Sequence, residues 1–564
     1  MGQRALPRVQ WGKHFEMHPV VFPAAAVVIL TLIGGCFVFP SEELEAAFKA
    51  LRDGISGWFG WLYVGTMTGF LLFALWLAFG PYGKLRLGAD DSKPEFSRVS
   101  WFSMLFSAGM GIGLLFYSVA EPISHFTSPP PTYGVSGGPD RLAMAMTIFH
   151  WGLHPWALYA VVGLCLAYFG FRKGLPLSFR SVLEPILGPR VWGRLGDCID
   201  LLAIVATLTG VATSLGIGAQ QVNAGLSFLF GISDSGSTQV VLIASITAVA
   251  TMSVVMGLDA GIRRLSEFNM GMAVLLMLMV VFGGGVVAFA TGCFSNAWAY
   301  LQLMPRASVT TGLIDTEAKS WLTGWTVFYW AWWIAWSPFV GLFIARVSKG
   351  RTFREYIIGV LLVPTGIGII WLTAFGGTTL TQHLAHENQP NQSLPIYRVA
   401  ELDSEGQPVV SEEGEISFTE SPLTVVEYRD SKVVAQDGKT IVQPLPTVLF
   451  VLVDELFEFS LITQLGVGIA LVCIVLFFVT SSDSASMVID IIASGGNPDP
   501  PVGTRLFWAI TEGLSAAALL TAGGLVALQA ASLAAALPFT IILILSCVSL
   551  VVALHREVGH SGNS

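Results

Sequence analysis

About twelve nearly uninterrupted apolar blocks, each about 20 residues long, divide this chain of 564 residues. That length lets an α-helix cross about 30 Å of hydrocarbon, where only helices and closed barrels satisfy their backbone polar groups. The blocks lie near residues 20–39, 58–80, 100–120, 144–170, 198–218, 238–258, 268–291, 322–345, 356–377, 465–488, 506–526 and 530–554. The sequence therefore predicts an all-α polytopic membrane protein.

Composition agrees with this prediction and excludes other classes of protein. Only 12% of the residues are charged and 53% are hydrophobic, whereas an ordinary soluble domain carries roughly a quarter charged residues. The net charge of −9 offers no basic surface for nucleic acid. The six cysteines are scattered, without the spacing of a metal site or a disulfide framework.

Positive charge predicts the orientation, because short cytoplasmic loops retain Lys and Arg. With the N-terminus inside, 20 of the 29 Lys and Arg residues fall in cytoplasmic segments, so we expect both termini in the cytoplasm of a bacterial inner membrane. The acidic segment 380–445 then lies outside. Val409-Val410 and Thr424-Val425-Val426 are compatible with a small β-hairpin cap, and a solvated loop is the alternative. Residues 446–459 suit an interfacial helix.

Two motifs of these spans resemble sites of soluble enzymes only in part. His150 and His154 lie one helical turn apart, a spacing that a metal could use, yet no third ligand is evident, so a packed, hydrogen-bonded pair is favoured. The glycines at 109, 111 and 113 match a dinucleotide fingerprint only in its first positions. Close helix packing is one interpretation of them, and a broken helix, whose free backbone groups become ligands, is the favoured one.

Tryptophan is concentrated in the span 322–345, where five of the 17 tryptophans lie between Trp325 and Trp336. An interfacial belt would place them at the ends of the span, but several lie near its middle. Trp325, Tyr329, Trp332 and Trp336 share one helix face, and Trp333 points about 100° away from it.

The span 144–170 adds three more aromatic residues, Trp151, Trp156 and Tyr159. Aromatic faces at mid-membrane, with no carboxylate expected nearby, suit a cation of diffuse charge such as a quaternary ammonium group. Aromatic packing between helices is the alternative.

Thr480 and Ser481 at membrane depth offer hydroxyl oxygens to a small hard cation, or hydrogen bonds to a neighbouring helix.

Four strings resemble the betaine/choline/carnitine transporter family: GMGIGLLFY, FHWGLHPWALYA, FYWAWWIAWSPFVGLFIARVSKGRT and FFVTSSDSAS. The resemblance covers about residues 10 to 555. It implies two inverted five-helix repeats of the leucine-transporter type, over 100–291 and 322–554, joined by a connector at 292–321. Residues 19–99 would form two extra helices, residues 1–18 and 555–564 would be short tails, and the assembly in the lipid would be a homotrimer.

The resemblance also assigns residues to a substrate site. Trp151, Trp156, Tyr159 and Trp333 match the aromatic box around a trimethylammonium group. Trp332 and Trp336 match aromatics on the route to the cytoplasm, with Trp330 beside them. The unwound stretch that meets the substrate carboxylate corresponds to Ala108, Gly109, Met110, Gly111, Ile112 and Gly113.

Two sodium sites follow from the same resemblance. Thr480 and Ser481 match the hydroxyl ligands of the main site, with backbone carbonyls from Ser107 and Met110. A second site would involve Thr207 and Phe339, but Val211 stands where a second hydroxyl is expected.

The expected function is import of a zwitterionic quaternary-ammonium osmolyte, glycine betaine above all, by sodium symport, with no cofactor beyond the coupling ions. Choline carriers of the family tend to have Asp where this chain has Gly113. A proton-coupled choline or carnitine-type carrier and a membrane receptor that binds the osmolyte without moving it are the alternatives. An enzyme is not expected, because no acid/base pair or nucleophile constellation is evident.

Overall fold

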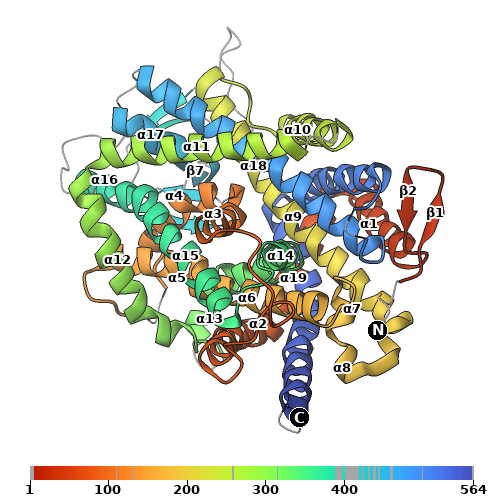
Figure 1. The fold of residues 1–564 in the computed structure, drawn as a ribbon. Coiled ribbons are helices and arrows are strands. Elements are labelled where there is room, and N and C mark those ends of the chain that lie inside the picture. Colours follow the sequence, from red (N-terminus) through yellow and green to blue (C-terminus); the bar gives the residue numbers. More distant parts are fainter. Residues whose placement is uncertain are drawn as a thin grey trace.

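The computed structural model describes most of the chain, namely residues 6–109, 111–130, 133–256, 259–313, 316–387, 397–400, 418–421, 425–429, 432–435, 440–441, 445–457, 461–497 and 499–561. Helices dominate it (Figure 1). The N-terminal half contains β1 (Val9–Trp11), β2 (Phe15–Met17), α1 (Val21–Val38), α2 (Ser41–Phe79), α3 (Arg98–Gly109), α4 (Ile112–Thr127), α5 (Pro139–Trp151), α6 (Leu153–Ala167), α7 (Phe179–Val182), α8 (Glu184–Leu187), α9 (Arg194–Phe230), α10 (Gly236–Met256) and α11 (Asp259–Gly284).

The C-terminal half is also mainly helical. It contains α12 (Val286–Ala307), α13 (Thr316–Gly324), α14 (Thr326–Val347), α15 (Phe353–Leu372), α16 (Thr378–Glu387), β3 (Tyr397–Ala400), β4 (Phe418–Ser421), β5 (Val425–Arg429), β6 (Lys432–Ala435), β7 (Thr440–Ile441), α17 (Val448–Phe457), α18 (Leu461–Ala493) and α19 (Val502–Ser561). Short π-helical turns, Tyr168–Arg172 and Thr373–Gly377, follow α6 and α15, and 3₁₀ turns cover Gly188–Trp192 and Leu445–Thr447.

Ten helical segments of the described part are long and apolar enough to cross a membrane. Two features account for the difference from the twelve predicted spans. The helix α19 is 60 residues long and contains non-helical backbone at Gly523 and Gly524, so it holds both of the last two spans. The span predicted at 100–120 is divided into α3 and α4, each shorter than a full crossing. The prediction of an all-α polytopic membrane protein is confirmed.

The division between α3 and α4 falls at the glycine-rich stretch. Helix α3 ends at Gly109, and Gly111 is extended, with φ −157° and ψ −179°, before α4 begins at Ile112. The helix is broken here, as favoured, and the other interpretation, close packing through small residues, also holds, because a Cβ at Gly113 would lie 2.6 Å from Trp332 Cη2. Met110 lies outside the described residues.

The acidic segment forms small antiparallel sheets. Strand β3 pairs with β4, and β5, β6 and β7 form a second sheet in that order. The β-branched run at Val425 and Val426 begins β5, whereas Val409 and Val410 lie outside the described residues. The described part of this segment therefore contains antiparallel strand pairs of the kind that the hairpin interpretation predicts. The helix α17 occupies the place of the predicted interfacial helix.

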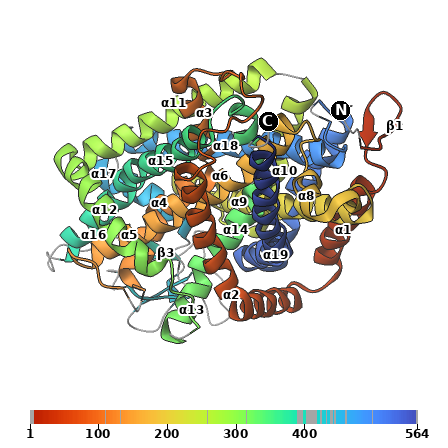
Figure 2. The ribbon, with the colours of Figure 1, turned by 60° about the horizontal axis from the view of Figure 1, so that its bottom comes forward.

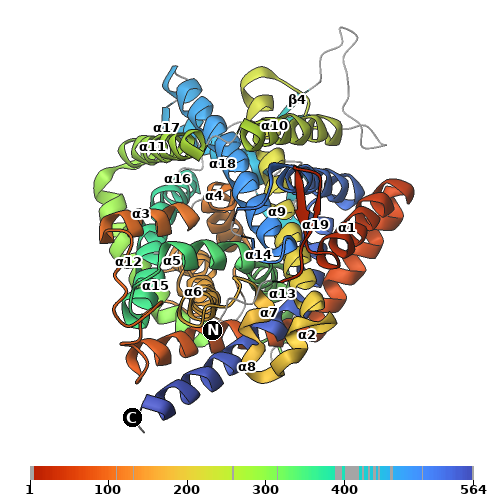
Figure 3. The same cartoon turned by 45° about the vertical axis from the view of Figure 1, so that its right-hand side comes forward.

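The helices α9 and α14 lie at the centre of the molecule and pack against each other (Figure 1). Helices α6 and α19 surround α14, and α2 crosses the face that comes forward in Figure 2, packing on α6, α14 and α19. The helices α10, α11 and α17 gather at one end, opposite the C-terminal end of α19 (Figures 1 and 3). This arrangement encloses the aromatic segments of α6 and α14 among other helices.

Two ionic clusters fasten the helices at their ends. Glu557 of α19 accepts hydrogen bonds from Arg172 Nε at 2.6 Å, Lys173 Nζ at 2.6 Å and Tyr168 Oη at 2.7 Å. Elsewhere Arg180 of α7, which is 1% exposed, donates from Nε to Asp200 Oδ2 of α9 at 2.5 Å.

Candidate functional site

Aromatic side chains of α5, α6 and α14 line a cavity in the middle of the molecule, with about 460 Å³ of space not filled by atoms, including space open to solvent. Glycines at the start of α4 and a serine of α9 complete its wall. The lining residues are Gly111, Gly113, Leu114, Trp151, Pro155, Trp156, Tyr159, Ser214, Trp332, Trp333 and Trp336. A cavity lined by apolar rings and a few polar atoms is typical of a small-molecule site.

A break between α5 and α6 places two of these indoles. Gly152, with φ −95° and ψ −132°, separates α5 from α6, and Pro155 follows in the first turn, where a missing N–H costs no hydrogen bond. The break leaves the carbonyl of His150 free for a partner outside the helix, and Trp333 Nε1 donates to it at 2.9 Å. Trp151 and Trp156 therefore flank the break, and Trp333 is tied to it.

The rings of α14 are held by their neighbours. Trp332 and Trp333 stack with centroids 4.7 Å apart and planes 12° apart, and Trp151 meets Trp333 edge-on at 4.8 Å. Trp332 Nε1 donates to the carbonyl of Gly210 on α9 at 3.2 Å. The predicted 100° between Trp332 and Trp333 holds for the helix positions, but both side chains are long enough to reach the same cavity.

Gly113 allows these rings to approach the backbone of α4. A Cβ atom at this position would lie 2.6 Å from Trp332 Cη2 and 3.2 Å from Trp151 Cη2. Real carbon atoms do not approach that closely without displacing one another. An acidic side chain at position 113 would therefore require Trp332 to move.

Two polar atoms of the cavity wall have no hydrogen-bond partner among the described residues. They are the hydroxyl of Tyr159 and the indole Nε1 of Trp336, both buried. Buried polar groups are nearly always paired in a native protein. These two atoms are therefore available to a bound molecule or to water.

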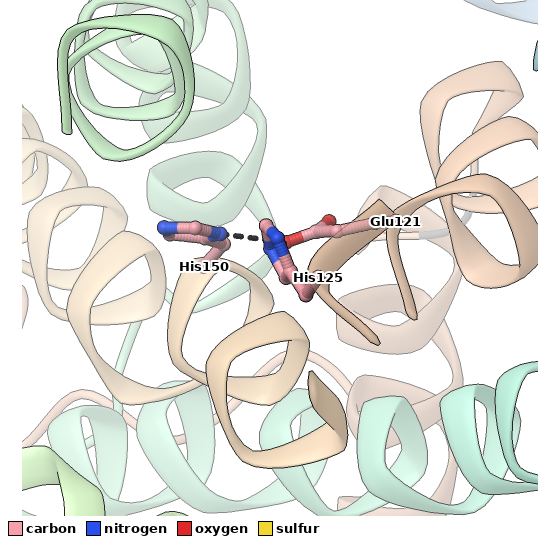
Figure 4. Close-up of side chains that lie close together, drawn as sticks. All are labelled: Glu121, His125 and His150. Atoms are coloured by element: carbon pink, nitrogen blue, oxygen red, sulfur yellow. Dashed lines mark hydrogen bonds and ion pairs between the residues drawn. The ribbon is translucent and has the colours of Figure 1, made fainter. Parts of the chain in front are cut away.

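A buried carboxylate lies directly behind the cavity wall. Glu121 of α4 is 0% exposed, and its Oε2 accepts hydrogen bonds from Trp151 Nε1 at 2.9 Å and from Tyr329 Oη at 2.5 Å. Its Oε1 lies 3.0 Å from His125 Nε2 and 2.6 Å from His150 Nδ1 (Figure 4). The expectation that no carboxylate lies near the aromatic cluster is therefore wrong.

The two histidines predicted as a pair have separate partners. His150 joins Glu121 and His125, while His154 Nε2 lies 3.0 Å from Ser308 Oγ. Both histidines are buried and hydrogen-bonded, but not to each other. A third group of metal-ligating type, which seemed to be missing, is present: ligand atoms of Glu121, His125 and His150 all lie within 4.8 Å of one another.

A second cavity, with about 640 Å³ of unfilled space, contains the predicted sodium-binding hydroxyls. Thr480 and Ser481 of α18 line it together with Phe339, and Trp336 lines both cavities. In this structure Thr480 Oγ1 donates to the carbonyl of Leu476 at 2.8 Å, which leaves its lone pairs free for a cation.

The remaining predicted residues are placed apart from the cavities or are not fully described. Trp330 is buried but stacks on His154, with centroids 5.6 Å apart, and is not among the lining residues. Thr207 donates to the carbonyl of Ala203 at 2.8 Å and lines neither of these two cavities. Side chains at positions 107–109 lie outside the description, as does the whole of Met110.

Three residues near the site escaped the sequence reasoning: Glu121, Tyr329 as its partner, and Ser214. The signal for Glu121 was present, because an acidic residue within a membrane helix usually marks a functional site. The predicted span ended at residue 120, which placed Glu121 outside the hydrocarbon, whereas α4 continues to Thr127. No sequence pattern singles out Ser214 among the many hydroxyl residues of α9.

Comparison with known proteins shows the family of this chain. A family described as "BCCT, betaine/carnitine/choline family transporter" matches residues 19–401 and 423–559. A glycine betaine/proline/choline transporter of Vibrio parahaemolyticus is 41% identical, with 96% of this chain and 91% of the relative covered. Glycine betaine transporter 1 of the same organism is 41% identical, over 97% and 95% of the two chains. The glycine betaine transporter OpuD of Bacillus subtilis is 40% identical, over 92% and 91%. The chain therefore belongs to the betaine/carnitine/choline family of transporters.

Proposed function

We propose that this protein imports glycine betaine, or a closely related zwitterionic quaternary-ammonium osmolyte, by sodium symport. The observation that carries the proposal is the cavity walled by Trp151, Trp156, Tyr159, Trp332 and Trp333. Aromatic faces attract an ammonium cation whose methyl groups prevent hydrogen bonding, and desolvation makes this attraction worth about 2 kcal/mol or more. Relatives named glycine betaine transporters support the same substrate.

The substrate carboxylate needs partners of a different kind, and the start of α4 can supply them. The first amides of a helix lack intrahelical acceptors, and the helix dipole places partial positive charge there. Gly111 and Gly113, which line the cavity, lie at this end of α4. The hydroxyl of Tyr159 is a further donor without a partner among the described residues.

Sodium would bind in the second cavity, through Thr480 and Ser481. Hydroxyl oxygens suit a hard cation, and backbone carbonyls near the break between α3 and α4 would complete its shell. Each sodium ion that enters down about 100 mV contributes about 2.3 kcal/mol, which corresponds to more than tenfold accumulation of substrate. We further propose that the protein is a homotrimer in a bacterial inner membrane with both termini in the cytoplasm.

Transport assays on purified protein in liposomes test this proposal. We expect a sodium gradient to drive accumulation of labelled glycine betaine, and a proton gradient alone to drive none. Vesicles preloaded with unlabelled betaine should exchange it for labelled betaine. Binding without exchange would identify a receptor, and accumulation driven by protons without sodium would refute symport with sodium.

Two variants connect the assay to the cavity. Trp156→Ala should abolish uptake and exchange, because it removes one wall of the aromatic enclosure. The matched control is Trp58→Ala, since Trp58 is 79% exposed on α2 and lines neither of the two cavities. Equal loss of transport in both variants would contradict the assigned site.

A further inference from the structure

We propose that Glu121, His125 and His150 form a binding site for a divalent transition-metal ion, of which zinc fits best, and that a bound ion weakens binding of the substrate cation in the neighbouring cavity. Capture of the ion does not depend on the proposed function. Only its effect on glycine betaine rests on that function.

The three side chains present a ligand set that suits zinc. Glu121 Oε1 lies 2.6 Å from His150 Nδ1 and 3.0 Å from His125 Nε2, and the three ligand atoms all lie within 4.8 Å of one another (Figure 4). Two imidazoles and one carboxylate form a common set of zinc ligands, which leaves a fourth position to water. Zinc bonds of about 2.0 to 2.1 Å hold ligand atoms roughly 3.3 Å apart, so the oxygen has to shift by less than about 1 Å.

The helices bring these ligands together before an ion arrives. Glu121 and His125 are four residues apart on α4, so both side chains lie on one face of that helix. His150 belongs to the last turn of α5, which packs against α4. All three side chains are buried, so their positions are fixed by packing on every side.

The other atoms of the cluster have partners that an ion would leave in place. Glu121 Oε2 accepts hydrogen bonds from Trp151 Nε1 at 2.9 Å and from Tyr329 Oη at 2.5 Å. His150 Nε2 lies 2.9 Å from Thr326 Oγ1. Metal ligands in proteins commonly have such outer partners, which orient the ligand and determine which imidazole nitrogen holds the proton.

His125 Nδ1 is buried and has no hydrogen-bond partner among the described residues. Buried polar atoms are nearly always paired, so hydrogen bonds within the cluster do not fully account for this ring. A ligating nitrogen must be free of a proton. When His125 Nε2 and His150 Nδ1 bind the ion, each ring holds its proton on its other nitrogen. Any further proton of the cluster passes to solvent.

Trp321 of α13 packs on both imidazoles and is itself partly exposed. Its ring centroid lies 4.9 Å from that of His125 and 6.2 Å from that of His150. Its Nε1 donates to the carbonyl of the exposed Ser128, just beyond the end of α4, at 3.1 Å. Breaking this one hydrogen bond lets the indole turn aside and opens a path for an ion. In the proposed orientation, this end of α4 faces the outside of the cell.

A bound ion makes the wall of the cavity more positive. One carboxylate with two neutral imidazoles carries one negative charge, or none when the cluster holds a further proton. With a divalent ion, the same groups carry one positive charge. Trp151 connects this charge to the cavity, because its N–H bonds to Glu121 and its ring lines the cavity. The ion therefore repels an ammonium group there through a medium of low dielectric constant.

The metal content of purified, untagged protein tests the site directly. Protein stripped with a chelator is incubated with Zn²⁺, Co²⁺ or Mg²⁺, desalted and analysed for bound metal. We expect one Zn²⁺ or Co²⁺ per chain and no retained Mg²⁺, because imidazole suits zinc and its neighbours but not magnesium. In His125→Gln, the dissociation constant for Zn²⁺ should rise more than about tenfold.

Control variants separate the three ligands from other histidines. His154→Gln is the matched control, because His154 is also buried but bonds to Ser308 instead of the cluster. It should retain zinc as wild type does. Melting temperatures identify unfolded protein, and Glu121→Gln replaces His125→Gln if that variant does not fold. Wild type without a stoichiometric ion, or equal zinc affinity in wild type and in a folded ligand variant, overturns the proposal.

A second measurement tests the effect on the cavity. The dissociation constant for glycine betaine is measured by calorimetry at fixed sodium concentration, with and without saturating Zn²⁺. It should rise about tenfold in wild type and stay unchanged on adding Zn²⁺ to His125→Gln. An unchanged constant in zinc-loaded wild type overturns the effect on the substrate. If the zinc-free protein binds no glycine betaine, the proposed function fails, while the metal content still decides whether the site exists.

Discussion

Trp333 provides a quantitative test of the aromatic enclosure, because its contacts can be removed one at a time. Its ring stacks on Trp332 at 4.7 Å and lines the cavity, and its N–H donates to the carbonyl of His150 at 2.9 Å. Trp333→Phe keeps an aromatic face and loses a hydrogen bond that forms with or without ligand, so the dissociation constant for glycine betaine should change by less than about fivefold. Trp333→Leu removes the cation–π attraction of about 2 kcal/mol, so the dissociation constant should rise about thirtyfold.

Isothermal titration calorimetry of solubilised protein at saturating sodium measures both values. Melting temperatures identify any variant that is unfolded, and Trp58→Leu controls for loss of an exposed indole. Leucine and phenylalanine are both apolar and of similar bulk, so their difference isolates the aromatic face. Equal dissociation constants for Trp333→Leu and Trp333→Phe would refute the reasoning, because apolar burial alone would then explain binding.

Three other predictions concern the second cavity and the ionic clusters. Thr480→Ala combined with Ser481→Ala should abolish the increase in betaine affinity on adding sodium, while potassium has no effect on either protein; unchanged stimulation in titrations would reject this sodium site. Glu557→Ala should lower the melting temperature, since hydrogen bonds between charged groups are worth about 1.5 to 3 kcal/mol, and high salt should shrink the difference from wild type. Asp200→Asn should cost about 1 to 3 kcal/mol, because buried Arg180 loses the charge of Asp200 but keeps Asp197, whose Oδ1 accepts from its Nη2 at 2.9 Å; Arg180→Met with Asp200→Leu should recover most of the melting temperature. A double variant no more stable than the single one would contradict this account.

The membrane spans and the broken helix could be predicted because they depend on local physics. Apolar length determines whether a segment crosses, and three glycines within five residues weaken a helix wherever it lies. The aromatic walls could also be predicted, since Trp333 lies in a span whose tryptophans gather near its middle, and the span 144–170 adds Trp151.

The position of the Glu121 carboxylate behind the cavity wall could not be predicted from the sequence in the same way. Its position depends on where α4 ends and on how α5 and α14 lie against it, and both are tertiary features. The separation of Trp330 from the other indoles has the same origin, because α5 and α6 supply Phe149 and His154 on its side of α14. Helical periodicity gives the direction of each side chain but not the neighbour that it meets.

Gly113 also restricts the order in which this site could be altered. A new side chain at position 113 meets Trp332 before it meets any ligand. A smaller or rotated residue at 332 must therefore precede any acidic residue at 113, and each of the two changes alone weakens the enclosure. Engineering that begins at position 113 should yield inactive intermediates, whereas libraries that vary the two positions together can reach a new specificity in one step.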